Sequence, residues 1–205
     1  MCRFLHEWLK QVCSGSHRSF APSLDAVEDR STGDNDNEVG RAGTVFSSPD
    51  DAFVEIAGGA DFVCARTEAG LIRCWGQNGF GQLGQGRPDD AIDFVDSPSV
   101  DLGAGARAVR LAAGGHTACA ILHTDRLKCW GRNDRGQLGA RIRDNLGSDA
   151  VRMGDALQPV DLGEGRYARQ VVIGRDFTCA LLDNATAKCW GANTHGQLGQ
   201  DEDWI

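Results

Sequence analysis

Short apolar runs separated by turn residues recur along the chain from about residue 43 onward. Gly, Asp and Asn lie in the breaks between the runs, and Val, Ile, Leu and Ala dominate within them. Runs of this length and composition are typical of β-strands in an all-β protein. In the last part of the sequence, strands are predicted at residues 158–162, 168–173, 177–181 and 187–190. The same plan is predicted twice upstream, within residues 45–47 and 54–75 and within residues 99–102 and 109–130.

These strands belong to a repeated unit. The motif Cys-x9-Cys-Trp-Gly-x-Asn-x-x-Gly-Gln-Leu-Gly begins at Cys64, Cys119 and Cys179 without internal gaps, and the copies start 55 and 60 residues apart. Periods near this length indicate a propeller, solenoid or array, and four strands per repeat favour a propeller blade. We therefore predict an all-β fold of three four-stranded blades, with repeats at about 43–97, 98–157 and 158–205.

The unit resembles the regulator-of-chromosome-condensation repeat over roughly residues 43–199. The resemblance implies a partial seven-bladed β-propeller, and it implies no single activity because one fold serves many tasks. The founding member of that family is a guanine-nucleotide exchange factor for a small GTPase, but its protruding β-wedge has no clear counterpart here. The residues that carry the resemblance are Trp75, Gly76, Asn78 and 81–84; Trp130, Gly131, Asn133 and 136–139; and Trp190, Gly191, Asn193 and 196–199.

Each copy has two cysteines on opposite sides of a predicted hairpin. If Thr67 pairs with Leu71, Cys64 lies directly opposite Cys74, with Cα atoms about 4.5–5.5 Å apart. That separation allows a disulfide, although reduced cysteines acting as small buried apolar side chains fit equally well. A zinc site is disfavoured because the close ligand spacing of zinc motifs is missing. The candidate disulfides are Cys64–Cys74, Cys119–Cys129 and Cys179–Cys189.

The repeated tryptophans Trp75, Trp130 and Trp190 each follow a cysteine and precede a glycine. A large side chain at the same place in every repeat is predicted to pack between neighbouring sheets, with its indole N–H bonded to a partner. His116 lies near a cysteine, but the other two copies have aspartate at this position. We therefore expect His116 at the surface or at the start of a strand, and not in a nucleophile–base pair.

The chain is acidic, with 29 Asp and Glu residues against 21 Lys and Arg residues and a net charge of −8. Because no run of basic residues interrupts this balance, nucleic acid is not a predicted partner. No apolar run is long enough to span a membrane. The sequence has no phosphate loop, nucleophile elbow or metalloprotease motif, so we predict no catalytic residue, no cofactor and no metal site.

The N-terminal part differs from the repeats. Residues 1–13 predict a short amphipathic helix, and residues 14–42 an acidic flexible linker before the repeat region at 43–205. His6 and Glu7 interrupt the apolar stretch that a signal peptide needs. The compartment is thus cytoplasmic if the cysteines are reduced and extracellular if they are paired. Three blades do not close a seven-bladed ring, so we expect self-association or completion of the ring by another chain.

The repeats differ most in the connectors after each Gly-Gln-Leu-Gly. Insertions in repeat arrays map to loops on one face, often the binding face, although solvated connectors without a role are the plain alternative. We predict a non-catalytic scaffold for protein–protein interaction. The alternatives are a guanine-nucleotide exchange factor for a small GTPase and a secreted, disulfide-stabilised surface binding protein. The predicted protein-binding residues are Asp89, Asp90, Asp93 and Asp96 in the first connector and Arg141, Arg143, Asp144, Asp149 and Arg152 in the second.

Overall fold

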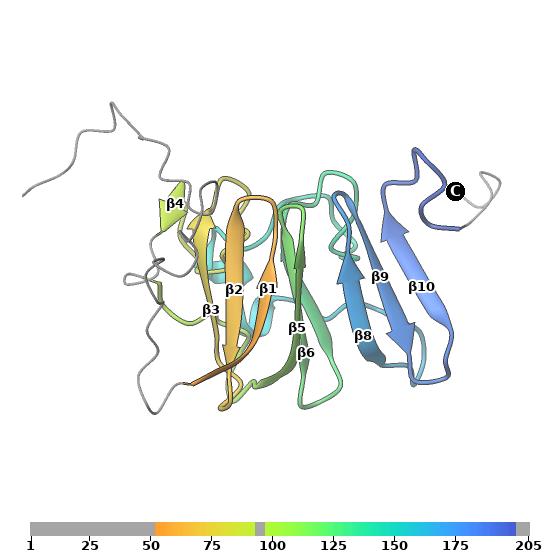
Figure 1. Cartoon of the computed structure of the whole chain (residues 1–205), viewed down its shortest axis with the longest axis horizontal. Helices are drawn as coiled ribbons and strands as arrows, with labels where there is room; N and C mark the ends of the chain where they lie inside the picture. Colours follow the sequence, from red (N-terminus) through yellow and green to blue (C-terminus); the bar gives the residue numbers. More distant parts are fainter. Residues whose placement is uncertain (1–51, 93–96, 200–205) are drawn as a thin grey trace, which may run out of the picture. The chain divides into compact units, whose positions relative to one another are not determined.

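A computed structural model of the protein describes residues 52–92 and 97–199. These residues form three antiparallel sheets, with two single-turn 3-10 helices, η4 (Ala150–Arg152) and η5 (Gly154–Ala156), between the second and third sheets in sequence (Figure 1). The predicted N-terminal helix, the predicted linker and the predicted strand at 45–47 lie outside the described residues. The first sheet holds β1 (Phe53–Gly58), β2 (Phe62–Thr67), β3 (Ile72–Gln77) and β4 (Ala91–Ile92); the second holds β5 (Ala108–Gly114), β6 (Thr117–Leu122) and β7 (Leu127–Gly131); the third holds β8 (Ala168–Ile173), β9 (Phe177–Leu182) and β10 (Ala187–Gly191).

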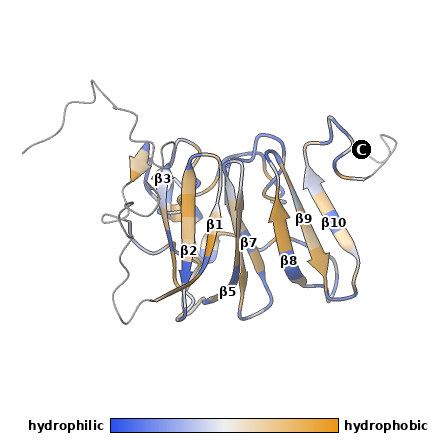
Figure 2. Cartoon of the chain, in the orientation of Figure 1, coloured by the Kyte–Doolittle hydropathy of each residue, from blue (hydrophilic) through white to orange (hydrophobic). Residues whose placement is uncertain are grey.

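The sheets pack against one another in chain order. Strand β1 contacts β5, and β5 contacts β8, so the first strands of the three sheets are neighbours (Figure 1). The N–H of Ala60 donates to the carbonyl of Gly115 at 2.7 Å, which links the β1–β2 turn to the corresponding turn of the second sheet. Every residue of β6 is buried because this central sheet has a packed neighbour on each face. In Figure 2 the strongly hydrophobic colours lie on the strands and the loops are mostly hydrophilic.

The hairpin register agrees with the prediction. The N–H of Thr67 donates to the carbonyl of Leu71 at 2.9 Å, and Cys64 is paired with Cys74 across β2 and β3. The same register holds in the other two sheets. The structure contains the three predicted disulfides, Cys64–Cys74, Cys119–Cys129 and Cys179–Cys189.

The first predicted strand of the second and third repeats differs from the prediction. Residues 99–102 and 158–162 form no regular strand, and the second and third sheets have three strands each among the described residues. Each of these segments instead makes one bond to the preceding sheet, from Val100 to the carbonyl of Ile72 and from Val160 to that of Leu127, both at 2.8 Å. Pro98 lies two residues before Val100 and has no N–H to donate to the next carbonyl of the ladder, and Pro159 directly precedes Val160.

Two aspartates end these short segments. Asp101 and Asp161 accept the N–H groups of Gly103 and Gly163 at 2.9 and 3.0 Å, a local side-chain bond that replaces a further bond to the sheet. A fourth strand is present in the first sheet, but it is β4, which lies within the segment predicted as a connector. The connectors are therefore more closely attached to the sheets than their composition suggested.

Candidate functional site

An Asn and a Gln side chain, buried in the first two repeats and partly buried in the third, shape the loop that follows the third strand of each repeat. In the second repeat the Asn133 carboxamide oxygen accepts the N–H of Leu138 at 3.0 Å, while its amide donates to the carbonyl of Ile142 at 2.6 Å. The Gln137 side-chain oxygen accepts the N–H of Arg135 at 2.9 Å. The Asn and Gln of the first and third repeats bond to the corresponding N–H groups. The Asn–Gln motif thus folds the loop upon itself and fixes where the connector begins.

The repeated tryptophans join one repeat to the next, as predicted. The indole N–H of Trp130 donates to the carbonyl of Gln82 at 3.0 Å, and that of Trp190 donates to the carbonyl of Gln137 at 2.9 Å. Both acceptors are the Gln of the Gly-Gln-Leu-Gly motif in the preceding repeat. These residues are explained by the packing of the sheets, and this leaves the non-repeated residues as candidates for function.

The predicted residues of the first connector are only partly described. Asp89 forms an ion pair with Arg87 at 2.7 Å, and both side chains are about half exposed. The carbonyl of Asp90 accepts the N–H of Asn78 at 2.7 Å, so its backbone helps to hold the connector against the first repeat. Asp93 and Asp96 lie outside the described residues.

The predicted residues of the second connector are described in full. Arg141 pairs with Asp161 at 3.2 Å, and Arg152 pairs with Asp144 at 2.9 Å. Asp149 accepts the N–H of Val151 at 3.0 Å and caps η4. Arg143 is exposed and makes no ion pair with any residue that the structure describes. The arginines of this connector are thus held mainly by local partners at the surface.

The two connectors meet through their backbones. The N–H of Gly86 donates to the carbonyl of Gly147 at 2.8 Å. The second connector also reaches the segment that follows the first one, because the N–H of Gly154 donates to the carbonyl of Asp101 at 3.1 Å. Among the described residues no bond links the predicted acidic residues of the first connector to the arginines of the second. The connectors are therefore neighbours, but their predicted binding residues are not joined in one network.

A groove of about 460 Å³ lies along the second connector. Its apolar lining includes Ile142, Leu146 and Val151, and Val151 is 77% exposed. Arg141 and Arg152 also line it, together with Asp161. A backbone bond from Gly163 and the nearby Arg141 hold the pKa of the Asp161 carboxyl below its ordinary value, so this group stays charged at neutral pH. The groove combines an apolar surface with charged groups, as the core and rim of protein-binding surfaces do.

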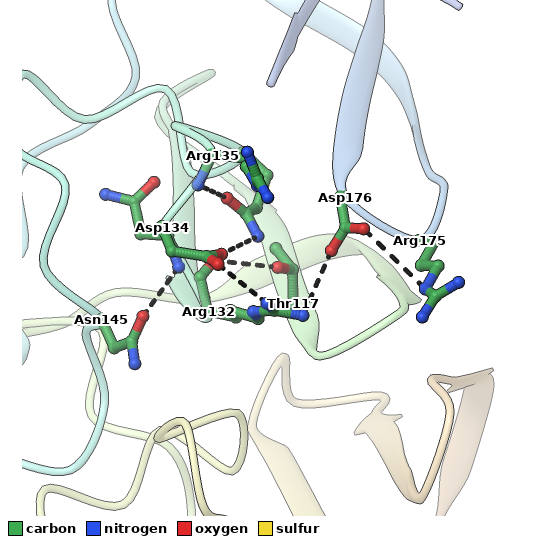
Figure 3. Close-up of polar contacts among 9 residues, drawn as sticks. Thr117, Arg132, Asp134, Arg135, Asn145, Arg175 and Asp176 are labelled. Atoms are coloured by element: carbon green, nitrogen blue, oxygen red, sulfur yellow. Dashed lines mark hydrogen bonds and ion pairs between the residues drawn. The ribbon is translucent and has the colours of Figure 1, made fainter. Parts of the chain in front are cut away.

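A charged cluster that the sequence analysis did not identify lies where the second and third repeats meet (Figure 3). Arg132 donates to Asp134 at 2.7 Å and to Asp176 at 3.4 Å, and its guanidinium lies 5.0 Å from the centre of the Phe80 ring. The Phe80 ring in turn stacks on His116 at 4.9 Å. His116 directly precedes β6, as expected for a residue at the start of a strand.

The charge of this cluster is maintained by its own hydrogen bonds. Burial of the Asp134 carboxyl favours the protonated form, but bonds from Arg132 and Gln137 outweigh it and keep the pKa of Asp134 below its ordinary value. A signal for the cluster was present in the sequence, because the residue equivalent to Arg132 is glutamine in the first repeat and alanine in the third. Residues that differ between repeats are not needed to build the repeat.

The described residues contain no group of three or more His, Cys, Asp or Glu side chains placed to hold a metal ion. No helix in the same part of the chain is long and apolar enough to cross a membrane.

The packed antiparallel sheets and the Trp–Gln contacts define a β-propeller repeat protein. The family description "Regulator of chromosome condensation (RCC1) repeat" matches residues 53–82, 108–137 and 168–197, and a second description of the same repeat matches residues 126–181. The chain belongs to this family, and the predicted partial propeller is confirmed.

Several curated proteins are similar to the chain. It is 31% identical over 176 residues to the ultraviolet-B receptor UVR8 of Arabidopsis thaliana, covering 84% of this chain and 37% of that protein. It is 32% identical over 162 residues to the probable E3 ubiquitin-protein ligase HERC4 of Mus musculus, covering 77% of this chain and 14% of the ligase. The chain thus spans little more than a third of the first relative and about a seventh of the second.

Two solved structures have the same fold. One is Kap60 bound to yeast RCC1 (Prp20), with a TM-score of 0.56 and 21% identity over 69% of this chain and 32% of that chain. The other is Prp20p from Saccharomyces cerevisiae, described with its binding properties to Gsp1p and histones; its TM-score is 0.56, with 18% identity over 73% of this chain and 34% of that chain.

Proposed function

We propose that this chain is a non-catalytic repeat module that binds another protein through the second connector. The observation that carries the proposal is the groove beside Ile142 and Val151, because most of its lining comes from the second connector, whose residues the other repeats do not share. Exposed apolar side chains next to paired charges are the composition of a protein-binding surface. A structural role alone does not require Val151 to be exposed.

The charged groups described here favour binding over catalysis. The ammonium of Lys128 is buried and bonded to the carbonyls of Leu102 and Gly154 at 2.8 and 2.9 Å, which ties the second connector to the segment at 99–102. Asp134 is paired with Arg132. The ligase named among the relatives is covered over only 14% of its length, so its activity is not inferred for this chain.

A pull-down with a matched pair of variants tests the proposal. Val151→Asp places a charge in the groove, while Val109→Asp places the same charge on β5 at a partly exposed residue outside the groove lining. We expect a protein captured by the wild-type chain and by Val109→Asp to be lost with Val151→Asp. Equal capture by both variants, with circular dichroism spectra unchanged, would contradict the use of this groove.

We further propose that the acidic first connector adds to the same polar surface. Replacing Asp89, Asp90, Asp93 and Asp96 together by asparagine is expected to weaken capture of that partner and reduce its dependence on salt, because screened charges contribute less at high ionic strength. The thermal midpoint is expected to change little. Unchanged affinity and salt dependence in this variant would remove the acidic connector from the site.

A nucleotide-exchange activity is the second candidate function. It rests on the fact that this chain belongs to the RCC1-repeat family, whose founding member is an exchange factor. A nucleotide-release assay against a panel of small GTPases separates the two candidates. Release stimulated by the wild-type chain, and by neither heat-treated protein nor buffer, would replace the scaffold proposal by an exchange function.

A further inference from the structure

Three arginines gather at the junction between the second and third repeats: Arg132 and Arg135 after β7, and Arg175 in the turn between β8 and β9 (Figure 3). We call them, with Asp134 and Asp176, the junction cluster. Two carboxylates face three guanidinium groups, so the cluster has an excess of positive charge on a chain whose net charge is −8.

The three arginines have different environments. Arg132 is largely used within the protein, because it bonds to both aspartates and lies over the Phe80 ring. The Arg175 side chain is 92% exposed, and its Nε lies 3.8 Å from Oδ2 of Asp176, which is a long contact for an ion pair. Arg135 is exposed, and its guanidinium makes no ion pair with any other described residue. The guanidinium groups of Arg135 and Arg175 are therefore available to a partner, while Arg132 keeps the aspartates between them in place.

The junction cluster is specific to this junction. The position of Arg135 is occupied by Phe80 in the first repeat and by His195 in the third, and the position of Arg175 is Ala60 in the first repeat and Gly115 in the second. The first junction has the Phe80–His116 stack in the corresponding place. Both kinds of junction are packed, so the arginines are not required to hold neighbouring repeats together.

We propose that the junction cluster binds an acidic polypeptide segment, with carboxylates bound by Arg135 and Arg175. An arginine fork matches a carboxylate in two parallel bonds, which makes this pairing strong and directional. Nucleic acid fits the cluster less well, because Asp134 and Asp176 lie among the arginines and oppose a closely spaced run of phosphates. The inference rests on the proposed protein-binding function and specifies its partner chemistry at a second surface.

The connector and the junction cluster adjoin each other through Asn133. The backbone N–H of this residue donates to the Asn145 side chain at 2.9 Å, and its side-chain amide donates to the carbonyl of Ile142, which lines the groove. Asn133 itself lies between Arg132 and Asp134 in sequence. One acidic segment with an apolar side chain can thus contact both the arginines and the groove.

The test uses a fluorescein-labelled peptide composed of glutamate and leucine, and fluorescence anisotropy at low and near-physiological salt. The variant Arg135→Gln/Arg175→Gln removes both available guanidinium groups. The control Arg126→Gln/Arg169→Gln removes the same charge from exposed arginines outside the cluster. We expect the first variant to bind the peptide at least about tenfold more weakly than the wild type, and the control to bind within about twofold, because local pairing contributes more than net charge.

An equal loss in both double variants would show attraction to net charge alone and overturn the proposal. Absence of peptide binding to the wild type, or tighter binding of a single-stranded oligonucleotide than of the peptide, would also overturn it. The pull-down with Val151→Asp is independent of these results, since a groove partner can be captured when the glutamate peptide does not bind. Failure of this inference and failure of the proposed function are thereby distinguished.

Discussion

At the scale of single residues, the Trp contacts impose a requirement for glycine in the preceding repeat. Gly84 has a backbone φ of 64°, and a Cβ added to it would lie 2.7 Å from the indole nitrogen of Trp130. Gly199 has the same φ of 64°, but an added Cβ would meet nothing within 4 Å among the described atoms. The two glycines therefore separate the cost of a left-handed backbone from the cost of a steric clash.

We predict that Gly84→Ala destabilises the protein more than Gly199→Ala does. Both variants bear the backbone cost of about 1 kcal/mol, and Gly84→Ala adds about 1–3 kcal/mol for overpacking against Trp130. Urea unfolding of the two variants and the wild type measures the difference. Equal losses of stability would show that the socket around the indole adjusts without cost, or that the site at Gly199 is also occupied in solution.

Lys128 gives a second prediction at this scale. Loss of water around the buried ammonium lowers the pKa of Lys128, while Asp155 opposes the shift. Between this lowered pKa and the ordinary value of 10.5, the unfolded chain binds more protons than the folded protein, so the contribution of Lys128 to stability rises with pH. We expect Lys128→Met to abolish that rise and to cost about 1–3 kcal/mol at neutral pH, because two buried carbonyls lose their donor.

Lys188→Met is the matched control, since Lys188 is exposed and bonds to one carbonyl, that of Leu162. Urea unfolding at neutral and alkaline pH provides the comparison. A Lys128→Met variant as stable as Lys188→Met, with the pH dependence of the wild type, would contradict the role assigned to the buried ammonium.

At the scale of elements, the three hairpins have the same disulfide in different surroundings. Cys119 and Cys129 are buried in the central sheet, and Cys64 and Cys74 are buried in the first. Cys179 and Cys189 are only partly buried. We predict that a reductant opens Cys179–Cys189 before the other two bonds, because thiol exchange requires access to a sulfur atom. Each short loop is expected to contribute about 2–3 kcal/mol.

Stepwise reduction followed by differential alkylation and peptide mass spectrometry measures the order. Protein made in an oxidising compartment is required for this experiment. Simultaneous opening of all three bonds would contradict the predicted order, and a different connectivity in the unreduced map would contradict the hairpin arrangement.

The hairpins could be predicted from the sequence because all their determinants are local. A fixed spacing of cysteines across a short turn defines the register, and the structure has Cys64 opposite Cys74. The connectors could not be predicted to the same degree, since their partners are remote in sequence, as in the bond from Gly86 to Gly147. The segment at 99–102 has the composition of a strand, but Pro98 and the Asp101 side chain limit its pairing to one residue.

The candidate site was predicted only in part for the same reason. Comparing loop lengths between repeats identified the second connector, which lines the groove. Comparing single positions would have identified Arg132, whose equivalents are uncharged. The cluster itself depends on the packing of the third sheet against the second, because this brings Asp176 to Arg132 across a long stretch of sequence. A single sequence shows which residues differ between the repeats, but it does not show which of them come into contact in the folded protein.

At the scale of the whole molecule, the first and third sheets each have one face without a neighbouring sheet among the described residues. Ile56 in β1 is 71% exposed, whereas Leu111, at the equivalent position of the central sheet, is 8% exposed. Leu181 in β9 is 41% exposed, whereas the equivalent Ile121 is 4% exposed. In the central sheet, the face equivalent to the exposed face of the first sheet packs on the preceding repeat, and the face equivalent to the exposed face of the third sheet packs on the following repeat. The exposed face of the third sheet is therefore complementary to the exposed face of the first.

We predict that the chain self-associates by packing the first sheet of one copy on the third sheet of another. Burial of the two apolar faces supplies the driving force, and the Trp–Gln contact between repeats gives the geometry. Light scattering over a concentration series should show mass increasing with concentration for the wild type. Ile56→Lys and Leu181→Lys should each shift the series toward the monomer, because a contact between unlike faces is broken from either side. Leu71→Lys, at a hairpin turn and 44% exposed, is the control and should associate as the wild type does. A monomer at every concentration, or equal effects of all three substitutions, would show that these faces do not bind each other in solution.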